Sequence, residues 1–271
     1  MPSGRIRTSN PVDRGYYLNQ KKAAWYKVMP WLYGGPTLCD LMGGTAATLN
    51  TFASGSGWTG ASAPGGFGSI ASNIGGGSTS NVLRPTGLVL PSTDWAVAAW
   101  GLCLATNSTF QALFAADSTQ PFLGVTAAGL PFFQTSAGPV TGTVPVAGSW
   151  HRYLGQVSST TGTTLWIDGQ MVGSIGGTSA TTSGSLGMLA ASSNLYTWDG
   201  FGDDWTIYLG DLSPAEVMAD YDEAIAGYPR SFARQKPARS ATASPGGGGG
   251  GGAWPGFYTD SSMSGFDSMG F

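Results

Sequence analysis

Short apolar runs recur along the middle of the chain, and clusters of Gly, Pro, Ser and Thr separate them. The longest run, residues 95–104, is long enough for one buried strand. Strands that recur every eight to twelve residues or so are typical of a β-sandwich or jelly roll, so the pattern predicts an all-β fold. The other predicted strands are residues 110–115, 122–125, 130–134, 151–157, 163–168, 170–175 and 186–190.

A tight hairpin is predicted where residues 163–168 meet residues 170–175. Asp168 and Gly169 stand between the two runs, and glycine readily adopts the positive φ that a two-residue turn requires. The two strands are therefore expected to pair directly with each other.

One helix stands out, over residues 212–225. Ser213 can cap it, Pro214 occupies the first helical position, and Glu216 completes a capping box with Ser213. Three side chains at a spacing of four would share one face of it: Val217, Tyr221 and Ile225.

The composition agrees with short strands and many turns. Gly (44) and Pro (16) are abundant, and charged residues make up 10% of the chain, against about 25% in an average soluble protein. We expect no secretory signal, and no run reaches the roughly 18 apolar residues of a membrane span, so we expect no membrane insertion. Cys39 and Cys103 leave two alternatives open, two buried free thiols or a single disulfide.

The charges are segregated along the chain. Residues 1–27 carry six cations and one acid, a net charge of +5, and residues 228–271 carry four cations and two acids, a net charge of +2. Residues 28–227 carry two cations, Arg84 and Arg152, against twelve acids, a net charge of −10. Such a distribution favours basic arms that lie on an acidic body, their own or a neighbour's. The alternative is that the arms are solvated tails whose charge is incidental.

The same distribution divides the chain into four parts. Residues 1–20 form a basic N-terminal arm, 21–228 a β body, 229–252 a linker that is basic and then glycine-rich, and 253–271 an aromatic C-terminal tail. Exposed aromatic clusters mark interaction surfaces, so the tail is expected to dock on a partner. The residues predicted to make arm contacts in an assembly are Arg5, Arg7, Arg14, Arg230, Arg234, Arg239, Trp254, Phe257, Tyr258 and Phe271.

Four sequence motifs follow one another in the second half of the body. A Trp-His strand start precedes a Thr-Leu-x-hydrophobic-Asp-Gly hairpin at residues 164–169. An aromatic-x-Gly-x-x-Asp-Asp-x-x-Ile-Tyr strand covers 198–208, and a Leu-Ser-Pro-Ala-Glu-hydrophobic helix start covers 212–217. With these motifs the chain resembles the laminin-G-like branch of the concanavalin A-like lectin/glucanase superfamily over residues 150–221. The structural motif positions are Trp150, His151, Asp168, Gly169, Gly200, Asp203, Asp204 and Tyr208.

The resemblance implies a two-sheet antiparallel jelly-roll sandwich over residues 21–228, with one short C-terminal helix and extended N- and C-terminal arms. An Asp-Gly-x-x-Asp-tyrosine segment that is usual in the family is absent, and residues 73–77 stand near its place. Trp31, Trp58 and Trp254 lie in loop-like contexts and are candidates for surface contacts. Four tryptophans match family positions that are buried or half-buried: Trp150, Trp166, Trp198 and Trp205.

Enzymatic hydrolysis is not expected. Retaining cleavage of a glycoside requires two carboxyl groups about 5–5.5 Å apart, one as acid and one as nucleophile. The chain has two glutamates, Glu216 and Glu223, and both lie in the predicted helix. His151 is the single imidazole, so any Ser-His-Asp triad would have to use it. At the family's Trp-His position, a hydrogen-bonded histidine at a strand start is expected instead.

A cation site is the alternative for three aspartates near the end of the body. Asp199, Asp203 and Asp204 are close in sequence, and Ca²⁺ binds several oxygen ligands. The family's Asp-Asp position implies instead that Asp203 or Asp204 anchors a neighbouring loop. Consecutive residues on a strand point to opposite faces, so the two are not expected to serve one ion. We therefore expect no cofactor, with a structural Ca²⁺ ion as the alternative.

The leading hypothesis is a non-enzymatic structural protein of a virion, a capsid decoration, head-fibre or tail component of a tailed bacteriophage. Its partners would be further copies of itself and other virion proteins, with arms that cross between subunits. One alternative is a carbohydrate-binding, lectin-like module that binds surface glycans at an extracellular or cell-surface location. Another is an extracellular filament subunit. The basic arms are too sparse to predict specific nucleic-acid binding.

Overall fold

A computed structural model describes parts of the chain between residues 24 and 226. The predicted arm (1–20), linker (229–252) and tail (253–271) lie outside the described residues, with all ten predicted arm-contact residues from Arg5 to Phe271. The described residues are 24–28, 37–38, 47–49, 57–59, 63–64, 70–73, 83–85, 89–106, 110–116, 121–179, 186–189 and 196–226.

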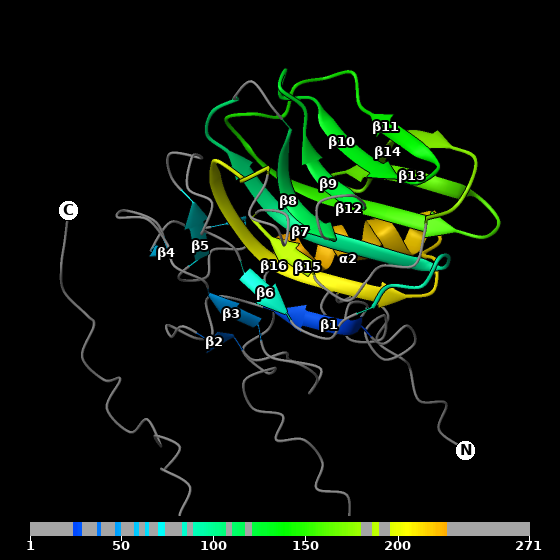
Figure 1. The fold of residues 1–271 in the computed structure, drawn as a ribbon, viewed down its shortest axis with the longest axis horizontal. Helices are drawn as coiled ribbons and strands as arrows, with labels where there is room; N and C mark the ends of the chain where they lie inside the picture. The colour runs from blue at the N-terminus through cyan, green and yellow to red at the C-terminus, as the bar shows by residue number, and fades with distance from the viewer. Residues whose placement is uncertain are drawn as a thin grey trace, which may run out of the picture. The chain divides into compact units, whose positions relative to one another are not determined.

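The described strands form two antiparallel sheets that face each other (Figure 1). In the first, sheet A, three long strands occupy the centre. The last of these in the chain, β16 (Gly200–Leu209), pairs with β7 (Trp95–Cys103) on one side. On its other side it pairs first with β5 (Ile70–Asn73) and then with β1 (Ala24–Val28). Across sheet A the order is β14 (Gln170–Ile175), β13 (Gly162–Ile167), β12 (Trp150–Ser158), β7 (Trp95–Cys103), β16 (Gly200–Leu209), β5 (Ile70–Asn73) and β4 (Gly57–Thr59), with β1 (Ala24–Val28) on β16.

The second sheet, sheet B, is built around a meander of four consecutive strands. Each of the strands β8 to β11 pairs antiparallel with the next one in the chain. Across sheet B the order is β11 (Gly138–Thr141), β10 (Pro131–Thr135), β9 (Phe122–Val125), β8 (Gln111–Ala116), β15 (Leu186–Met188), β6 (Leu83–Pro85), β3 (Ala47–Leu49) and β2 (Thr37–Leu38). The structure therefore has the predicted two-sheet antiparallel sandwich.

Side chains from the inner faces of both sheets fill one continuous core. Strand β7 contributes Trp95, Val97 and Ala99 to this core, and Phe133 enters it from sheet B. The ring of Trp95 meets that of Phe133 edge-on, with 6.0 Å between ring centroids. The close approach requires a glycine opposite, because a Cβ atom at Gly155 would lie 2.7 Å from the Phe133 ring. The apolar side chains on the inner faces of the two sheets thus pack against each other and hold the sandwich together.

The outer face of sheet A is covered by the helix α2 (Pro214–Ala226), which lies behind β7 and β16 in Figure 1. The Ser213 hydroxyl accepts a hydrogen bond from the amide of Glu216 (3.4 Å), and the Glu216 carboxylate accepts one from the amide of Ser213 (2.8 Å). This reciprocal pair is the predicted capping box. Because α2 covers the sheet, Ala96 and Ala98 on the second face of β7 are also buried, which explains the continuous apolar run.

The helix face shared by Val217, Tyr221 and Ile225 is not the most buried face of α2. Val217 is buried and Tyr221 is half-buried, but Ile225 is 42% exposed. The inward positions are instead Val217, Asp220 and Ala224, a mixed spacing of three and four that follows the helical repeat. Within the described part of the chain, no helix is long and apolar enough to cross a membrane.

Candidate functional site

The hairpin between β13 and β14 places a carboxylate against the start of β12. Asp168 and Gly169 both have positive φ, 52° and 76°, and they form the two-residue turn that the sequence predicts. The Asp168 carboxylate lies 2.7 Å from Nδ1 of His151 and accepts a hydrogen bond from the amide of Arg152 at 2.8 Å. Asp168 therefore does more than form a turn: it holds His151 and the first residues of β12 in place.

A fully buried arginine lies between sheet A and α2. Arg152 is 1% exposed and projects from β12 on the face opposite His151. Its Nε and Nη2 donate to the two carboxylate oxygens of Asp220 on α2, at 3.0 and 3.1 Å. Its Nη1 donates to the carbonyl oxygen of Asp204 at 2.8 Å and to the Asp204 carboxylate at 3.2 Å. The hydroxyl of Tyr208 donates to Asp220 at 2.6 Å, which completes a buried polar network.

Burial and charge act in opposite directions on this arginine. Burial by itself lowers the pKa of Arg152, but the negative charges of Asp220 and Asp204 outweigh it and raise the pKa above its ordinary value. Burial, and then the charges of Asp220 and Glu223, raise the pKa of Tyr208 well above its ordinary value. Arg152 is thus held as a cation and Tyr208 as a neutral donor. The sequence reasoning assigned roles to Asp204 and Tyr208 but none to Arg152 or Asp220.

The Asp203–Asp204 pair sits on a β-bulge, which corrects the expectation that the two side chains point to opposite faces. The register between β16 and β7 shifts between Asp203 and Thr206, and Asp204 has a φ of 47°. The Asp203 carboxylate accepts a hydrogen bond from the amide of Asp204 at 2.8 Å. Both are buried, at 4% and 3% exposure, and the bulge interrupts the regular alternation of faces at this point of β16. Among the described residues, there is no group of three or more His, Cys, Asp or Glu side chains that could hold a metal ion.

The motif glycine of β16 lies where a side chain would not fit. Gly200 has a φ of 153°, and a Cβ atom there would lie 1.9 Å from the carbonyl oxygen of Leu102 on β7. The neighbouring Trp198 donates from its indole nitrogen to the carbonyl oxygen of Phe201 at 3.1 Å. Gly200 thus allows β16 to approach β7 closely.

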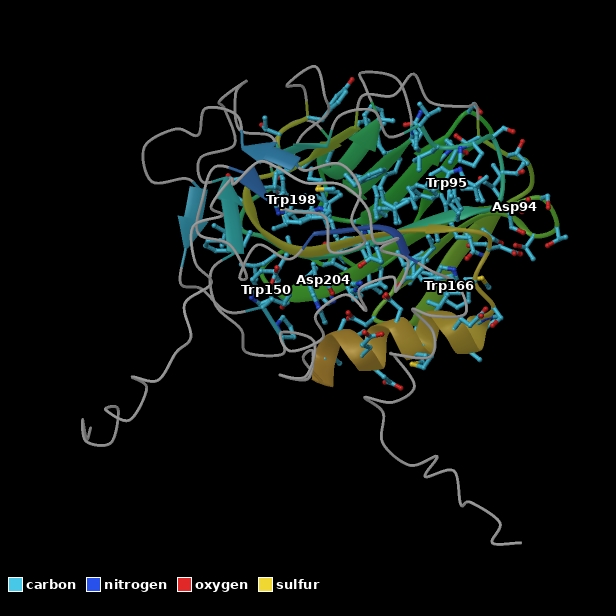
Figure 2. The ribbon with its side chains drawn as sticks, turned by 90° about the horizontal axis from the view of Figure 1, so that it is seen from below. Asp94, Trp95, Trp150, Trp166, Trp198 and Asp204 are labelled. Carbon is cyan, nitrogen blue, oxygen red and sulfur yellow. The ribbon has the colours of Figure 1, made fainter. Side chains whose placement is uncertain are left out.

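The tryptophans of the described body serve mainly as core. Trp198 and Trp205 are fully buried and Trp166 is 7% exposed. Figure 2 shows Trp150 and Trp166 on the side of the sheet that faces the helix, and Trp95 and Trp198 on its other side. Trp58 lies in β4, not in a loop, whereas Trp31 and Trp254 lie outside the described residues.

A stacked aromatic pair with one exposed ring lies on the outer face of sheet B. Phe133 points into the core, so its neighbour Phe132 points outward. The ring of Phe110 stacks on that of Phe132, with 4.7 Å between centroids and 14° between planes. Phe110 is 44% exposed, and Phe132 beneath it is 4% exposed. Phe132 pairs across the sheet with Gly124 on one side and with the exposed Thr141 on the other.

The backbone next to Phe110 is held by a buried amide. Gln111 is 1% exposed, and its Nε2 donates to the carbonyl oxygen of Ala105 at 2.7 Å. Its Oε1 accepts a hydrogen bond from the amide of Asp199 at 2.7 Å. The amide of Leu104 in turn donates to the carbonyl oxygen of Asp199 at 2.8 Å. These hydrogen bonds connect the start of β8 to the segment after β7 and to the segment before β16. They thereby fix the position of the backbone next to Phe110. Sequence reasoning missed this surface, because nothing in the local pattern distinguishes an exposed Phe110 from a core residue.

Cys103 is a buried free thiol at the end of β7. Cys39 lies outside the described residues. The alternatives predicted for the two cysteines are two buried free thiols or a single disulfide between them. Burial, and then the negative charge of Asp199, raise the pKa of the Cys103 thiol from 9.0 to about 11. The thiol is therefore held in its neutral form at neutral pH.

Comparisons with known proteins agree with this architecture. The family described as the concanavalin A-like lectin/glucanases superfamily, in its laminin-G type, matches residues 75–218, which is more than half of the chain. No curated protein sequence matches the chain.

Several solved structures share the fold at low sequence identity. Domain 4 of AbnA, an extracellular GH43 arabinanase from Geobacillus stearothermophilus solved with arabinotriose, has a TM-score of 0.52 and 16% identity, over 74% of this chain and 99% of that one. The sialidase of Trypanosoma rangeli, solved with the inhibitor DANA, has a TM-score of 0.54 and 10% identity, over 80% of this chain and 38% of that one. The binding domain of botulinum neurotoxin DC, solved with SialylT, has a TM-score of 0.51 and 10% identity, over 76% and 52%.

Loss of the buried carboxylate on α2 should destabilise the fold strongly. We expect Asp220→Ala to lower the free energy of unfolding by about 3–5 kcal/mol, because it leaves the Arg152 charge buried and unpaired. Urea denaturation followed by tryptophan fluorescence measures this change. The matched control is Asp222→Ala, an exposed aspartate on the same helix, with an expected change within about 0.5 kcal/mol. Equal effects of the two substitutions would contradict a stabilising role for the network.

The Cys103 thiol should make the fold sensitive to alkaline pH. The unfolded chain loses this proton near pH 9.0, whereas the folded chain keeps it to about pH 11. The contribution of the thiol to stability is therefore complete below pH 9.0 and is lost as the pH rises to about 11. Denaturation curves of Cys39→Ser and Cys39→Ser/Cys103→Ala across this range provide the test. A shallower loss is expected in the second variant, and identical pH profiles would count against the assignment.

Proposed function

Because the chain belongs to the concanavalin A-like lectin/glucanases superfamily, we propose that it is a non-enzymatic carbohydrate-binding module. The proposed ligand is a neutral oligosaccharide, and the proposed site is the outer face of sheet B at Phe110. The observation that carries the proposal is the half-exposed ring of Phe110, stacked on the buried ring of Phe132.

An aromatic ring held in this way suits a sugar ring. One face of a pyranose or furanose presents C–H groups, which favour the electron-rich face of an aromatic ring. Phe132 fixes the plane of Phe110 from below, and the Gln111 amide fixes its backbone, so little conformational entropy remains to be lost on binding. The exposed Thr141 beside Phe132 offers a hydroxyl group for hydrogen bonds to sugar hydroxyls.

The charges of the body favour a neutral sugar over an acidic one. Residues 28–227 have a net charge of −10, and their two cations are Arg84 and Arg152. Arg152 is 1% exposed and already occupied by Asp220 and Asp204. The strands β8 to β11 contain no charged residue. A sialic acid carboxylate would therefore meet repulsion at β8 to β11, where the strands offer no cation to pair with it.

The positions of the titratable side chains support a binding role rather than an enzymatic one. Glu216 is engaged in the capping box of α2, and Glu223, a residue of the same helix, is 5% exposed. His151 is held by Asp168. Glu216 and His151 thus have structural roles in α2 and at the start of β12, and neither element belongs to the sheet that carries Phe110. An extracellular or cell-surface location fits a module that binds glycans, in keeping with the extracellular arabinanase whose domain shares this fold.

A second candidate is the subunit of a particle such as a virion, and the charge segregation favours it. Basic arms, at net +5 and +2, flank a body of net −10, so arm–body contacts between copies would be attractive. Light scattering of the full chain in rising salt tests this role. Assemblies held by the arms should disperse above about 0.5 M salt, where screening is strong. Replacement of Arg230, Arg234 and Arg239 by serine should disperse them at low salt, and no change in mass in either experiment would remove this candidate.

Removal of the exposed ring should abolish sugar binding without harm to the fold. We expect Phe110→Ala to weaken binding of a neutral oligosaccharide at least about tenfold, or about 1.4 kcal/mol, and Phe110→Tyr to retain it. Calorimetric titration with arabinotriose and a glycan array, with and without calcium, measure this. Leu209→Ala is the matched control, because Leu209 has the same 44% exposure at the end of β16.

Two outcomes would contradict the proposal. One is the absence of any neutral glycan bound by the wild-type chain on the array. The other is equal affinity of Phe110→Ala and wild type for a neutral glycan that does bind. A preference for sialylated over neutral glycans would refute the choice of ligand class.

A further inference from the structure

Two sheet edges that lie side by side carry no charge. Residues 118–150 and residues 169–198 contain no Asp, Glu, Lys or Arg. The first stretch includes β9, β10 and β11, and the second includes β14. Among the described strands, β11 ends sheet B and β14 ends sheet A. Charged residues are the usual protection of an edge strand against unwanted pairing, and this protection is missing here.

The two edges meet at glycines and present apolar side chains to solvent. A Cβ atom at Gly173 of β14 would lie 2.7 Å from Val140 of β11, so the strands approach closely there. Figure 1 shows β11 and β14 next to each other at one side of the sandwich. Met171 is 55% exposed, Val172 is 36% exposed, and Val144 in the loop after β11 is 69% exposed. A Cβ atom at Gly142 would lie 3.6 Å from Val172, which brings the loop of Val144 next to β14.

Among the described strands, none pairs with the outer side of β14. Four of its six residues are exposed, and it contains neither a charged residue nor a proline. Every second residue of an edge strand directs its amide and carbonyl groups away from the sheet, where another strand can bind them. Edge β11 contains Pro139, which lacks an amide donor. The pairing capacity therefore lies on β14.

We propose that β14 pairs antiparallel with β14 of a second copy of this chain, so that sheet A continues across a two-fold axis. A two-fold axis places each residue near its own counterpart, so like charges would oppose each other across the interface. The body has a net charge of −10, and most of its surface would repel an identical body. The charge-free seam of β11 and β14 lets two copies approach, and Met171, Val172 and Val144 are covered when they do.

This proposal does not depend on glycan binding. The Phe110 ring lies on the outer face of sheet B, whereas the pairing edge belongs to sheet A. A dimer of this kind would carry two copies of the sugar-binding surface, which would raise the avidity for a repeating polysaccharide.

Sedimentation equilibrium of the full chain tests the pairing. We expect a wild-type dimer, and we expect Met171→Lys to raise the dissociation constant at least about tenfold, because two lysines would face each other near the axis. Ser174→Lys, at a second exposed position of β14, should act in the same direction. Ile225→Lys is the control: Ile225 is also exposed, at 42%, but lies on α2, and its dimer should match wild type. Thermal melts confirm that each variant is folded.

Salt separates this dimer from an assembly held by the charged arms. Screening reduces the repulsion between two acidic bodies, so the β14 dimer should persist or tighten as salt rises. Amides of residues 170–175 should also exchange more slowly with deuterium at high protein concentration than at low concentration. A chain that stays monomeric up to about 1 mM, the weak limit of specific association, would overturn the proposal. So would a dimer that Met171→Lys and Ile225→Lys affect equally.

Discussion

The architecture of sheet A depends on the buried ion pairs that the guanidinium group of Arg152 makes with Asp220 and Asp204. A charge enclosed by protein is tolerated only where partners replace the water that it has lost. Here the partners are the carboxylates of Asp220 and Asp204 and the carbonyl oxygen of Asp204. They come from α2 and from the bulge of β16, while the arginine itself comes from β12. One side chain thus sets the positions of three elements far apart in the sequence.

The proposed glycan-binding surface lies on sheet B because α2 already covers the outer face of sheet A. Since α2 is anchored on the outer face of sheet A, that face is closed by Val217, Tyr208 and Trp166. The outer face of sheet B bears the exposed Phe110 ring instead. The two sheets therefore differ in role: one is fastened to the helix, and the other presents an aromatic surface to solvent. The structural neighbours, at identities of 10–16%, are related to this chain by fold alone.

Much of the fold could be predicted from the sequence, and most of the site could not. The strands β7 to β10 and β12 to β14 follow apolar runs, and the Asp168 turn and the α2 cap have local signatures. Strand β11 was missed because Gly138 and Pro139 look like turn residues, and β3 to β6 because each has only three or four residues. Pairing of Arg152 with Asp220 spans 68 residues, and no local pattern marks a charge as buried. The exposure of Phe110 likewise depends on which neighbours pack around it.

The pairing of β16 also sets the order in which the chain can fold. This strand lies in sheet A between β7 and β1, which precede it by about a hundred residues or more. At roughly 5–20 residues per second of synthesis, β7 waits on the order of 5–20 seconds for its neighbour to leave the ribosome. During that interval one of the most apolar strands of the molecule has an open edge. The open edge of β7 is therefore closed only by a non-local pairing, a kind of contact that forms slowly.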